Sequence, residues 1–425
     1  MQVEEWSPVL VDDLIRRGVL ALNDGYRVRN IELGPTGIPF VRGGDIGLGD
    51  INTNVEDHIR LEFSDRVRSK LTRPFDVAFI TKGTVGRVGL MRPGQPVSVF
   101  APQVCYWRSL DTEQLEPRFL FYLLRSSGFQ SNLDAVKTHG SMAADYVSLS
   151  DQRRFKLTIP PIQSQRSIAN ILGTLDDKIE LNRRMTATLE AMARALFQSW
   201  FVDFDPVRRN AEGGESRPED LLFPDSFEES EMGGIPKGWK VKSLDKIADY
   251  QNGLALQKFR PAENEDPLPI VKIAQLKAGE PTWDEVASPS INPACIIDTG
   301  DVVFSWSGSL VVTVWTGGRA ALNQHLFKVT SQNYPKWFYF HWTQKHLVDF
   351  QRIAEDKAVT MGHIKRSHLS EAMCVVPDAK ALQEGTRRIA LLIEQMIVLE
   401  TQSRTLAALR NVLLPKLLGK IVEST

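Results

Sequence analysis

The second half of this 425-residue chain repeats the first half at a spacing of about 220 residues. Residues 6–12 match 239–245 at an offset of 233, and residues 157–160 match 374–377 at an offset of 217. The matching segments keep the same order along the chain, and the offset changes only by loop-sized steps. Such ordered similarity predicts one duplicated structural unit and therefore a two-domain architecture.

Each unit has two parts with different sequence patterns. Residues 1–160 and 236–378 contain short runs of β-branched residues interrupted by Gly and Pro, a pattern typical of strands and turns. Within these parts, helices are expected around 117–124 and 335–350. The strand signals and the few helix signals together indicate a mixed α/β domain in each half.

The other part of each unit has the pattern of a long helix. A heptad register of apolar residues runs through 164–200, and a copy of it follows 217 residues later. A helix of that length would be about 55 Å long, which favours pairing of the two helices in an antiparallel coiled coil. The polar positions Asn182, Thr186 and Ser403 would help to set its register. The alternative is that each helix packs on its own globular part, and Pro415 is expected to end or kink the second helix.

The predicted fold is therefore α+β, with two pseudo-repeated mixed α/β domains joined by two long helices that form an antiparallel coiled coil. Between the halves, residues 203–231 contain ten acidic and three basic residues, which suggests a solvated acidic linker. The rest of the chain is mildly basic and compatible with DNA binding. The expected segments are a first domain at 1–160, a central helix at 161–202, a linker at 203–235, a second domain at 236–378 and a C-terminal helix at 379–425.

Searches for catalytic motifs argue against an enzyme. The chain has no GxxxxGK[ST] or GxGxxG motif and no Asn-Pro-Pro-aromatic tetrad, so neither ATP hydrolysis nor adenine methylation is indicated. Acidic pairs followed by lysine at 176–178 and 355–357 fit a Mg²⁺ site locally, but solvated acids explain both better. Cys105, Cys295 and Cys374 lie far apart without a CxxC motif. No catalytic residue and no metal site are predicted.

Membrane insertion and export are not indicated either. No apolar run approaches the roughly 18 to 20 residues of a membrane span, and the first ten residues are acidic rather than basic and apolar. We expect a cytoplasmic protein.

Three loop clusters recur at matching places in the two halves and carry hydroxyls, amides and cations, which can contact phosphates and base edges. For any single residue, a turn or a phosphate contact is the more ordinary explanation. The recurrence, with different side chains in each copy, favours recognition of two different sequences. The candidates for DNA binding are Arg42, Lys82, Thr84, Arg87, Gln103, Lys137 and Ser141 in the first domain, and Lys272, Ser307, Ser309, Asn323, Gln324, Lys357, His363 and Lys365 in the second.

The centre of the chain resembles a known protein family. LDDKIELNRR at 175–184, followed by TLEAM at 188–192 and FQSWFVDF at 197–204, is similar to the central conserved region of type I restriction-modification specificity subunits. Further segments, at 24–27, 37–42, 300–304 and 322–327, are similar to the target-recognition domains of that family. The resemblance covers nearly the whole chain. It implies a non-catalytic subunit whose two domains each bind one half of a bipartite, asymmetric DNA site, with the coiled coil setting the spacer.

The resemblance also implies partners. These are double-stranded DNA, two methyltransferase subunits and two motor-nuclease subunits, with S-adenosylmethionine, ATP and Mg²⁺ bound by the partner subunits and no cofactor on this chain. Candidate docking residues for the methyltransferases, which a solvated helix face would explain equally well, are Arg166, Arg183, Arg184, Arg387 and Arg388. Two alternatives remain open: an enzyme such as a solitary methyltransferase or fused nuclease, and a protein–protein adaptor that does not bind DNA.

Overall fold

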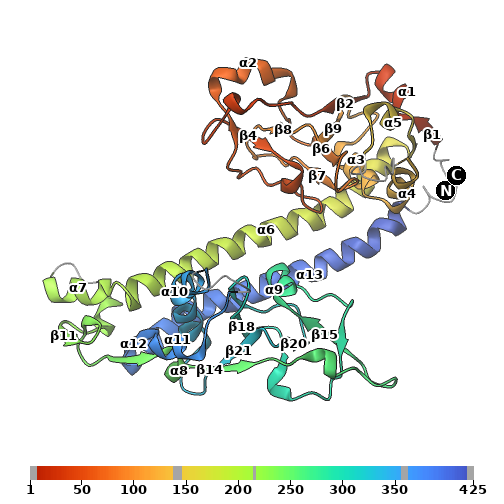
Figure 1. Ribbon diagram of the computed structural model, residues 1–425. Helices are drawn as coiled ribbons and strands as arrows, with labels where there is room; N and C mark the ends of the chain where they lie inside the picture. The colour runs from red at the N-terminus through yellow and green to blue at the C-terminus, as the bar shows by residue number, and fades with distance from the viewer. Residues whose placement is uncertain (1–6, 137–145, 214–216, 356–361, 419–425) are drawn as a thin grey trace. The chain divides into compact units, whose positions relative to one another are not determined.

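The computed structural model describes residues 7–136, 146–213, 217–355 and 362–418 (Figure 1). The chain divides into two compact units, one formed by residues 1–178 together with 406–425 and the other by residues 179–405. Each unit therefore combines one end of each long helix with one mixed α/β part.

The described part of the first unit contains a four-stranded antiparallel sheet that forms the centre of its core. The order of its strands is β2 (Leu20–Asp24), β9 (Val104–Ser109), β6 (Val77–Ile80) and β7 (Val88–Leu90). A second sheet has the order β3 (Leu33–Gly34), β5 (His58–Ile59), β4 (Ile38–Val41) and β8 (Val99–Phe100), and in it β4 and β8 are parallel. A separate pair joins β1 (Ser7–Leu10) to β10 (Lys156–Ile159).

Helix α3 (Pro117–Leu124) packs on the central sheet of this unit. The helix begins after Glu116, whose carboxylate accepts a hydrogen bond from the Arg118 amide, and Pro117 occupies its first turn, where no backbone donor is needed. The six residues from Phe119 to Leu124 are all buried. The unit also contains α1 (Val11–Arg16), α2 (Ser64–Val67), α4 (Ser127–Val136) and α5 (Leu149–Arg153).

The second unit repeats this topology. Its central sheet has the order β14 (Asp249–Asn252), β21 (Leu326–Thr330), β18 (Val302–Ser305) and β19 (Val312–Val314). The other sheet has the order β16 (Val286–Ala287), β15 (Leu268–Val271), β20 (Ala320–Leu322) and β17 (Ile296–Ile297), with β15 and β20 parallel, and β13 (Lys240–Ser243) pairs with β22 (Met373–Val376). Its helices are α8 (Leu244–Ile247), α9 (Ile273–Ala278), α10 (Lys336–Glu355), α11 (Arg366–Glu371) and α12 (Ala379–Gly385). The central sheet and the parallel pair confirm the predicted duplication, whereas the second sheets differ at their edges, with β3 beside β5 in one unit and β17 beside β20 in the other.

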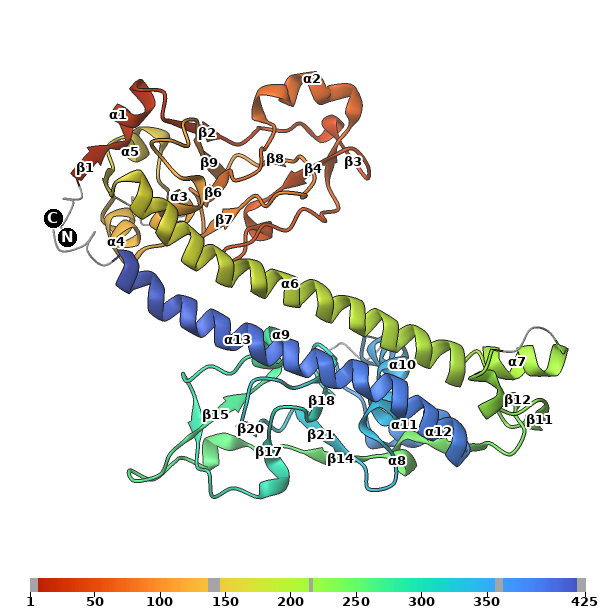
Figure 2. The ribbon, with the colours of Figure 1, turned by 180° about the vertical axis from the view of Figure 1, so that it is seen from behind.

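The two long helices are α6 (Ile162–Phe201) and α13 (Leu391–Leu418), which lie side by side in both views (Figures 1 and 2). In the second unit, Asn182 of α6 hydrogen-bonds to Ser403 of α13. In the first unit, Asp176 of α6, which precedes Asn182, pairs with Arg410 of α13, which follows Ser403. The helices are therefore antiparallel, as predicted.

Pro415 was expected to end or to kink the second helix, and the first of these two expectations was wrong. The helix does not end at Pro415 but continues to Leu418, the last described residue. The reason is packing: Leu413, Leu414, Leu417 and Leu418 contact the apolar core of the first unit and hold the last turn in place. Proline inside a helix removes one backbone hydrogen bond, and the packing of these leucines offsets that loss.

The segment expected to be a linker is largely folded where the structure describes it. It contains α7 (Asp205–Glu212) and the hairpin of β11 (Phe227–Ser230) and β12 (Gly233–Pro236). Phe204, Val207 and Phe223 are buried in the core of the second unit, and Arg209 forms an ion pair with the buried Asp220 at 2.7 Å. These apolar residues alternate with the acids, so the segment packs despite its charge.

Candidate nucleic-acid interface

Three loops of the second unit meet beside the central sheet. They are the loop 306–311 between β18 and β19, the turn 323–325 between β20 and β21, and the segment 362–365 before α11. Backbone hydrogen bonds hold them together: Gly308 N donates to Gly362 O at 2.8 Å, and Trp306 N donates to His325 O at 3.3 Å. Three segments distant in sequence thus form one continuous surface.

Several predicted residues meet on this surface. Ser307 and His363 pair as an isolated antiparallel bridge, and the Trp306 indole N–H donates to the carbonyl oxygen of Gln324 at 3.1 Å. The Ser307 hydroxyl lies 2.9 Å from His325 Nδ1, and the Trp306 ring is near the rings of both His325 and His363, at centroid distances of 6.0 and 6.3 Å. The structure thus brings the predicted Ser307, Gln324 and His363 together, with Gln324 and His363 exposed and Ser307 buried.

Trp306 and His325 belong to this surface although the sequence did not single them out. Trp306 lies within the recurring loop cluster at 305–309 and His325 within the family-like segment at 322–327, but neither was named as a candidate. Aromatic rings at such a surface can stack on exposed bases or pack against sugars.

The remaining candidates of the second unit have varied surroundings. Asn323 is buried, and its side-chain oxygen accepts a hydrogen bond from His325 N at 3.2 Å, which shapes the turn. Lys272 forms an ion pair with Glu285, while Ser309 and Lys365 are exposed. Lys357 lies outside the described residues.

The first unit places an equivalent turn beside its own sheet. Thr81, the residue before Lys82, donates hydrogen bonds to the carbonyl oxygen of Gln103 from its amide at 2.9 Å and from its hydroxyl at 3.1 Å. Lys82 is exposed and pairs with Tyr146 as an isolated bridge, and Thr84 is exposed as well. Lys82 and Gln103, 21 positions apart, therefore lie on neighbouring loops.

Two further candidates of this unit already have protein partners. Arg87 donates to the carbonyl oxygen of Ile46 at 3.2 Å and is half-buried, so it holds a loop in place. Arg42 forms an ion pair with Asp57 at 2.6 Å. Lys137 and Ser141 lie outside the described residues.

Gln103 and Gln324 occupy the same place in the two folds. Each follows a strand of the parallel pair, β8 or β20, and precedes the central strand, β9 or β21. A glycine crosses closely over each turn: a Cβ at Gly25 would overlap Ala101 O, and one at Gly253 would overlap Leu322 O. A glutamine amide can donate and accept at once, which suits the edge of adenine in the major groove.

These surfaces offer hydrogen bonds and charge rather than acid–base or metal chemistry. Within the described ranges, no group of three His, Cys, Asp or Glu side chains is placed to hold a metal ion. The three cysteines are buried, and burial raises the pKa of each thiol above its ordinary value. Among the helices that are described, none is long and apolar enough to cross a membrane.

The candidate docking arginines lie on or beside the long helices and are ion-paired. Arg183 and Arg184 both bond to Glu180, which lowers the pKa of that carboxyl to about 2. Arg387 and Arg388 share Glu384 in the same manner, and Arg166 pairs with Glu113 at 2.7 Å.

Comparisons with known proteins agree with this arrangement. A family model described as the type I restriction modification DNA specificity domain matches residues 28–191 and 236–403. The chain is 23% identical over 352 residues to the HindI specificity subunit of Haemophilus influenzae, covering 71% of this chain and 77% of that one. It is 24% identical over 310 residues to the MjaIX specificity subunit of Methanocaldococcus jannaschii, covering 70% of this chain and 67% of that one.

A solved structure shares the fold. The crystal structure of a type I restriction-modification S subunit from M. genitalium superimposes with a TM-score of 0.57 at 14% identity, covering 98% of this chain and 97% of that one. Each of the two segments matched by the family model contains one set of loops described above together with part of a long helix. The chain therefore belongs to the family of type I restriction-modification specificity subunits, the non-catalytic DNA-recognition subunits of these systems.

Proposed function

We propose that this specificity subunit binds a bipartite, asymmetric DNA site, with one half-site read by each target-recognition domain. The domains correspond to residues 1–160 and 236–378. The central helix at 161–202 and the C-terminal helix at 379–425 connect them, and residues 203–235 join the halves. The observation that carries the proposal is the repeated turn, which presents Gln103 in one unit and Gln324 in the other amid different neighbours.

The neighbours of the two glutamines explain why the half-sites would differ. Gln103 is accompanied by the exposed Lys82, whereas Gln324 is accompanied by Trp306, Ser307 and His325. A lysine that contacts phosphates carries no sequence information, while amides and hydroxyls can read base edges. The same scaffold thus carries two different sets of hydrogen-bonding groups.

The length of α6 would set the spacer between the half-sites. The helix has 40 residues and contributes to both units without interruption. A straight helix of that length spans about 60 Å at 1.5 Å per residue. Because a packed helix does not stretch, the number of its residues would determine the number of unread base pairs.

The outer faces of the long helices would dock two methyltransferase subunits, and the complete complex would add two motor-nuclease subunits. Leu181, Met185 and Met192 of α6 are between 40% and 49% exposed, although they lie on the same helix as Arg183 and Arg184. Apolar side chains flanked by arginines suit a partner helix with apolar and acidic positions. The partners would supply S-adenosylmethionine, ATP and Mg²⁺.

Methylome mapping tests this proposal. Genomic adenine methylation would be compared between a host with this gene and the same host without it, with the neighbouring methyltransferase gene intact. Loss of one bipartite motif is expected, and the motif would give both half-sites and the spacer. An unchanged methylome in a host whose methyltransferase is expressed would favour the protein–protein adaptor instead.

A further inference from the structure

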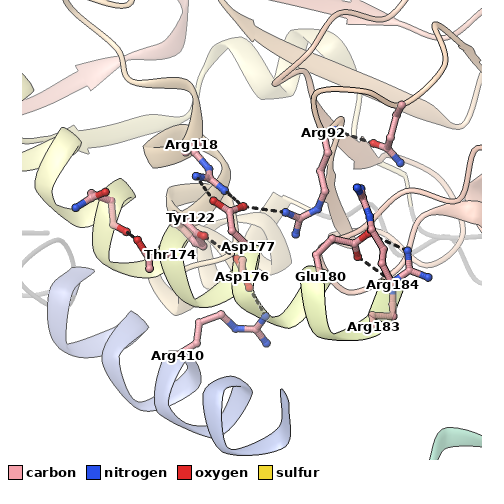
Figure 3. Close-up of polar contacts among 12 residues, drawn as sticks. Arg92, Arg118, Tyr122, Thr174, Asp176, Asp177, Glu180, Arg183, Arg184 and Arg410 are labelled. Atoms are coloured by element: carbon pink, nitrogen blue, oxygen red, sulfur yellow. Dashed lines mark hydrogen bonds and ion pairs between the residues drawn. The ribbon is translucent and has the colours of Figure 1, made fainter. Parts of the chain in front are cut away.

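Two adjacent aspartates of α6 connect three parts of the first unit (Figure 3). Asp176 accepts a hydrogen bond from the Tyr122 hydroxyl of α3 at 2.6 Å and one from Arg410 of α13 at 2.6 Å. Asp177 accepts from Arg118 at the start of α3 and from Arg92, which follows β7, at 3.4 Å. The recognition domain is thus bonded to α6 directly and to α13 through Asp176.

The Asp176 part of this network is withdrawn from water, whereas the side chain of Asp177 is 55% exposed. The side chains of Asp176 and Arg410 are only 6% and 17% exposed, and that of Arg118 is 23% exposed. Burial and the neighbouring Asp176 carboxylate raise the pKa of Tyr122, so the hydroxyl remains a donor. A buried charge that loses its partner is strongly destabilising. A change in the orientation of the domain that separated Asp176 from Arg410 would therefore be unfavourable.

Because Gly173 has no side chain, the Arg118 guanidinium can lie close against the backbone of α6. A Cβ at this position would lie 2.8 Å from Nη1 of Arg118, which crosses over the helix to reach Asp177. Glycine inside a helix is normally unfavourable. Its presence here is explained by the room that the Arg118 guanidinium needs.

The second unit has no such network at the equivalent positions. With the offset of 217, Gly173 and Asp176 correspond to Ala390 and Ile393, and Tyr122 of α3 corresponds to Phe340 of α10 at an offset of 218. Ile393 and Phe340 are both buried in one apolar cluster. At these positions the second unit therefore packs apolar side chains where the first uses directional, charged contacts, and its own charged contact lies elsewhere, where Arg404 of α13 donates to Gly279 O and, at 2.6 Å, to Thr316 Oγ1.

We propose that Asp176 and Asp177 are positioning residues that fix the orientation of the first target-recognition domain on the helix pair and thereby restrict the spacer length that the protein accepts. Apolar packing is non-directional, whereas an ion pair with several hydrogen bonds favours one geometry. This inference rests on the proposed function, because it needs a bipartite site. Neither aspartate would touch DNA.

The test uses the full chain assembled with its methyltransferase subunits. Methyl transfer would be measured on DNA duplexes that carry both half-sites with the natural spacer, or with a spacer one base pair shorter or longer. For Asp176→Asn, the ratio of the rate on the natural spacer to that on the altered spacers should fall about tenfold, which corresponds to the loss of one hydrogen bond to a charged group. For Asp177→Asn, whose side chain is 55% exposed, the ratio should fall by a smaller factor.

Two further variants provide the controls. Gly173→Ala should displace the flexible end of Arg118 while improving the helix, so the melting temperature should hold and the spacer ratio should still fall. Glu190→Gln removes an ion pair with Arg194 within α6, at 2.5 Å, and should leave the ratio unchanged. If an aspartate variant does not fold, Gly173→Ala decides the question.

The outcomes are distinguishable. Equal losses of rate on all three spacers, with the ratio unchanged, would show that the network only stabilises the fold and would overturn the inference. A wild-type complex that methylates no bipartite site would overturn the proposed function, and the inference with it.

Discussion

Asn182 of α6 is fully buried, and its side-chain amide donates to Ser403 Oγ of α13 at 3.2 Å. It also donates to Gln402 Oε1 at 2.9 Å, while its own side-chain oxygen has no hydrogen-bond partner. A buried polar residue in an apolar seam lowers stability but favours a single register. Of the polar positions predicted from the heptad pattern, Asn182 and Ser403 therefore meet between the two helices, whereas the buried hydroxyl of Thr186 has no hydrogen-bond partner among the described residues.

Replacing Asn182 by leucine is expected to stabilise the helix pair. The change removes the buried oxygen that lacks a partner, so the free energy of unfolding should rise by about 1 kcal/mol. Chemical denaturation monitored by circular dichroism measures this change. A loss of more than about 1 kcal/mol would show that the hydrogen bonds to Gln402 and Ser403 outweigh the cost of burial.

Lengthening α6 is expected to lengthen the spacer. Four residues inserted after Asn182 add about 6 Å, which corresponds to one or two base pairs at about 3.4 Å each. The methylated motif would be read by sequencing. The same insertion at Glu231, in the exposed turn between β11 and β12, serves as the control and should leave the spacer as it was. An unchanged spacer after the α6 insertion would refute the proposal that the length of α6 sets the spacer.

Lys82→Ala is expected to weaken DNA binding by a similar factor on every sequence, because an exposed lysine contacts phosphates rather than bases. The slope of log affinity against log salt should become shallower by about 0.9. Fluorescence anisotropy of the assembled complex at several salt concentrations measures both effects. Lys156→Ala alters an exposed lysine of β10 that belongs to none of the candidate loops, and its slope should match the wild type.

Gln324→Ala is expected to relax one base position of the second half-site. Loss of an amide that contacts a base edge should reduce discrimination at that position by about 1–3 kcal/mol. Binding to a panel of single-base variants of the half-site would locate the position. A loss that is equal for all sequences would mean that Gln324 contacts the backbone instead.

Stability of the second unit is expected to fall in mild acid because of His341. Burial lowers the pKa of this imidazole to about 4, and its ring stacks on Phe197 at a centroid distance of 5.1 Å. The unfolded chain takes up a proton near pH 6.5 and the folded chain only near pH 4, so stability present above pH 6.5 is lost as the pH falls through this window.

The same pKa difference gives the expected loss in the free energy of unfolding, which is about 3 kcal/mol. Denaturation at pH 7 and at pH 4 measures it, and His341→Phe, which keeps an aromatic ring beside Phe197, should remove most of the difference between the two values. Equal pH dependence of the two proteins would assign the acid sensitivity to other groups.

The duplicated architecture and the long helices could be predicted because their signals are local or periodic. A heptad pattern is repeated every few residues along 164–200, and strand runs such as 77–80 are contiguous. The polar positions Asn182 and Ser403 were recognised in the same way, as interruptions of a pattern.

The recognition surface was predicted only in part. Ser307, Gln324 and His363 were identified individually, but His325 was missed, because its hydrogen-bonding distance to Ser307 depends on a turn that lies 18 positions further along the chain. The side-chain partners of Arg42 and Lys272 could not be predicted for the same reason, since Asp57 and Glu285 belong to separate loops.

Asp176 shows most clearly what the sequence left undecided. As one of two adjacent acids followed by lysine, it suggested either a metal ligand or a solvated acid, and the latter interpretation was wrong, because the side chain is buried. Its partners, Tyr122 and Arg410, lie 54 and 234 positions away. The sequence alone determined the repeat and the helical periodicity, since these arise within short windows. Only the tertiary structure decided which charges are paired and buried, because that depends on contacts between distant segments and on exclusion of water.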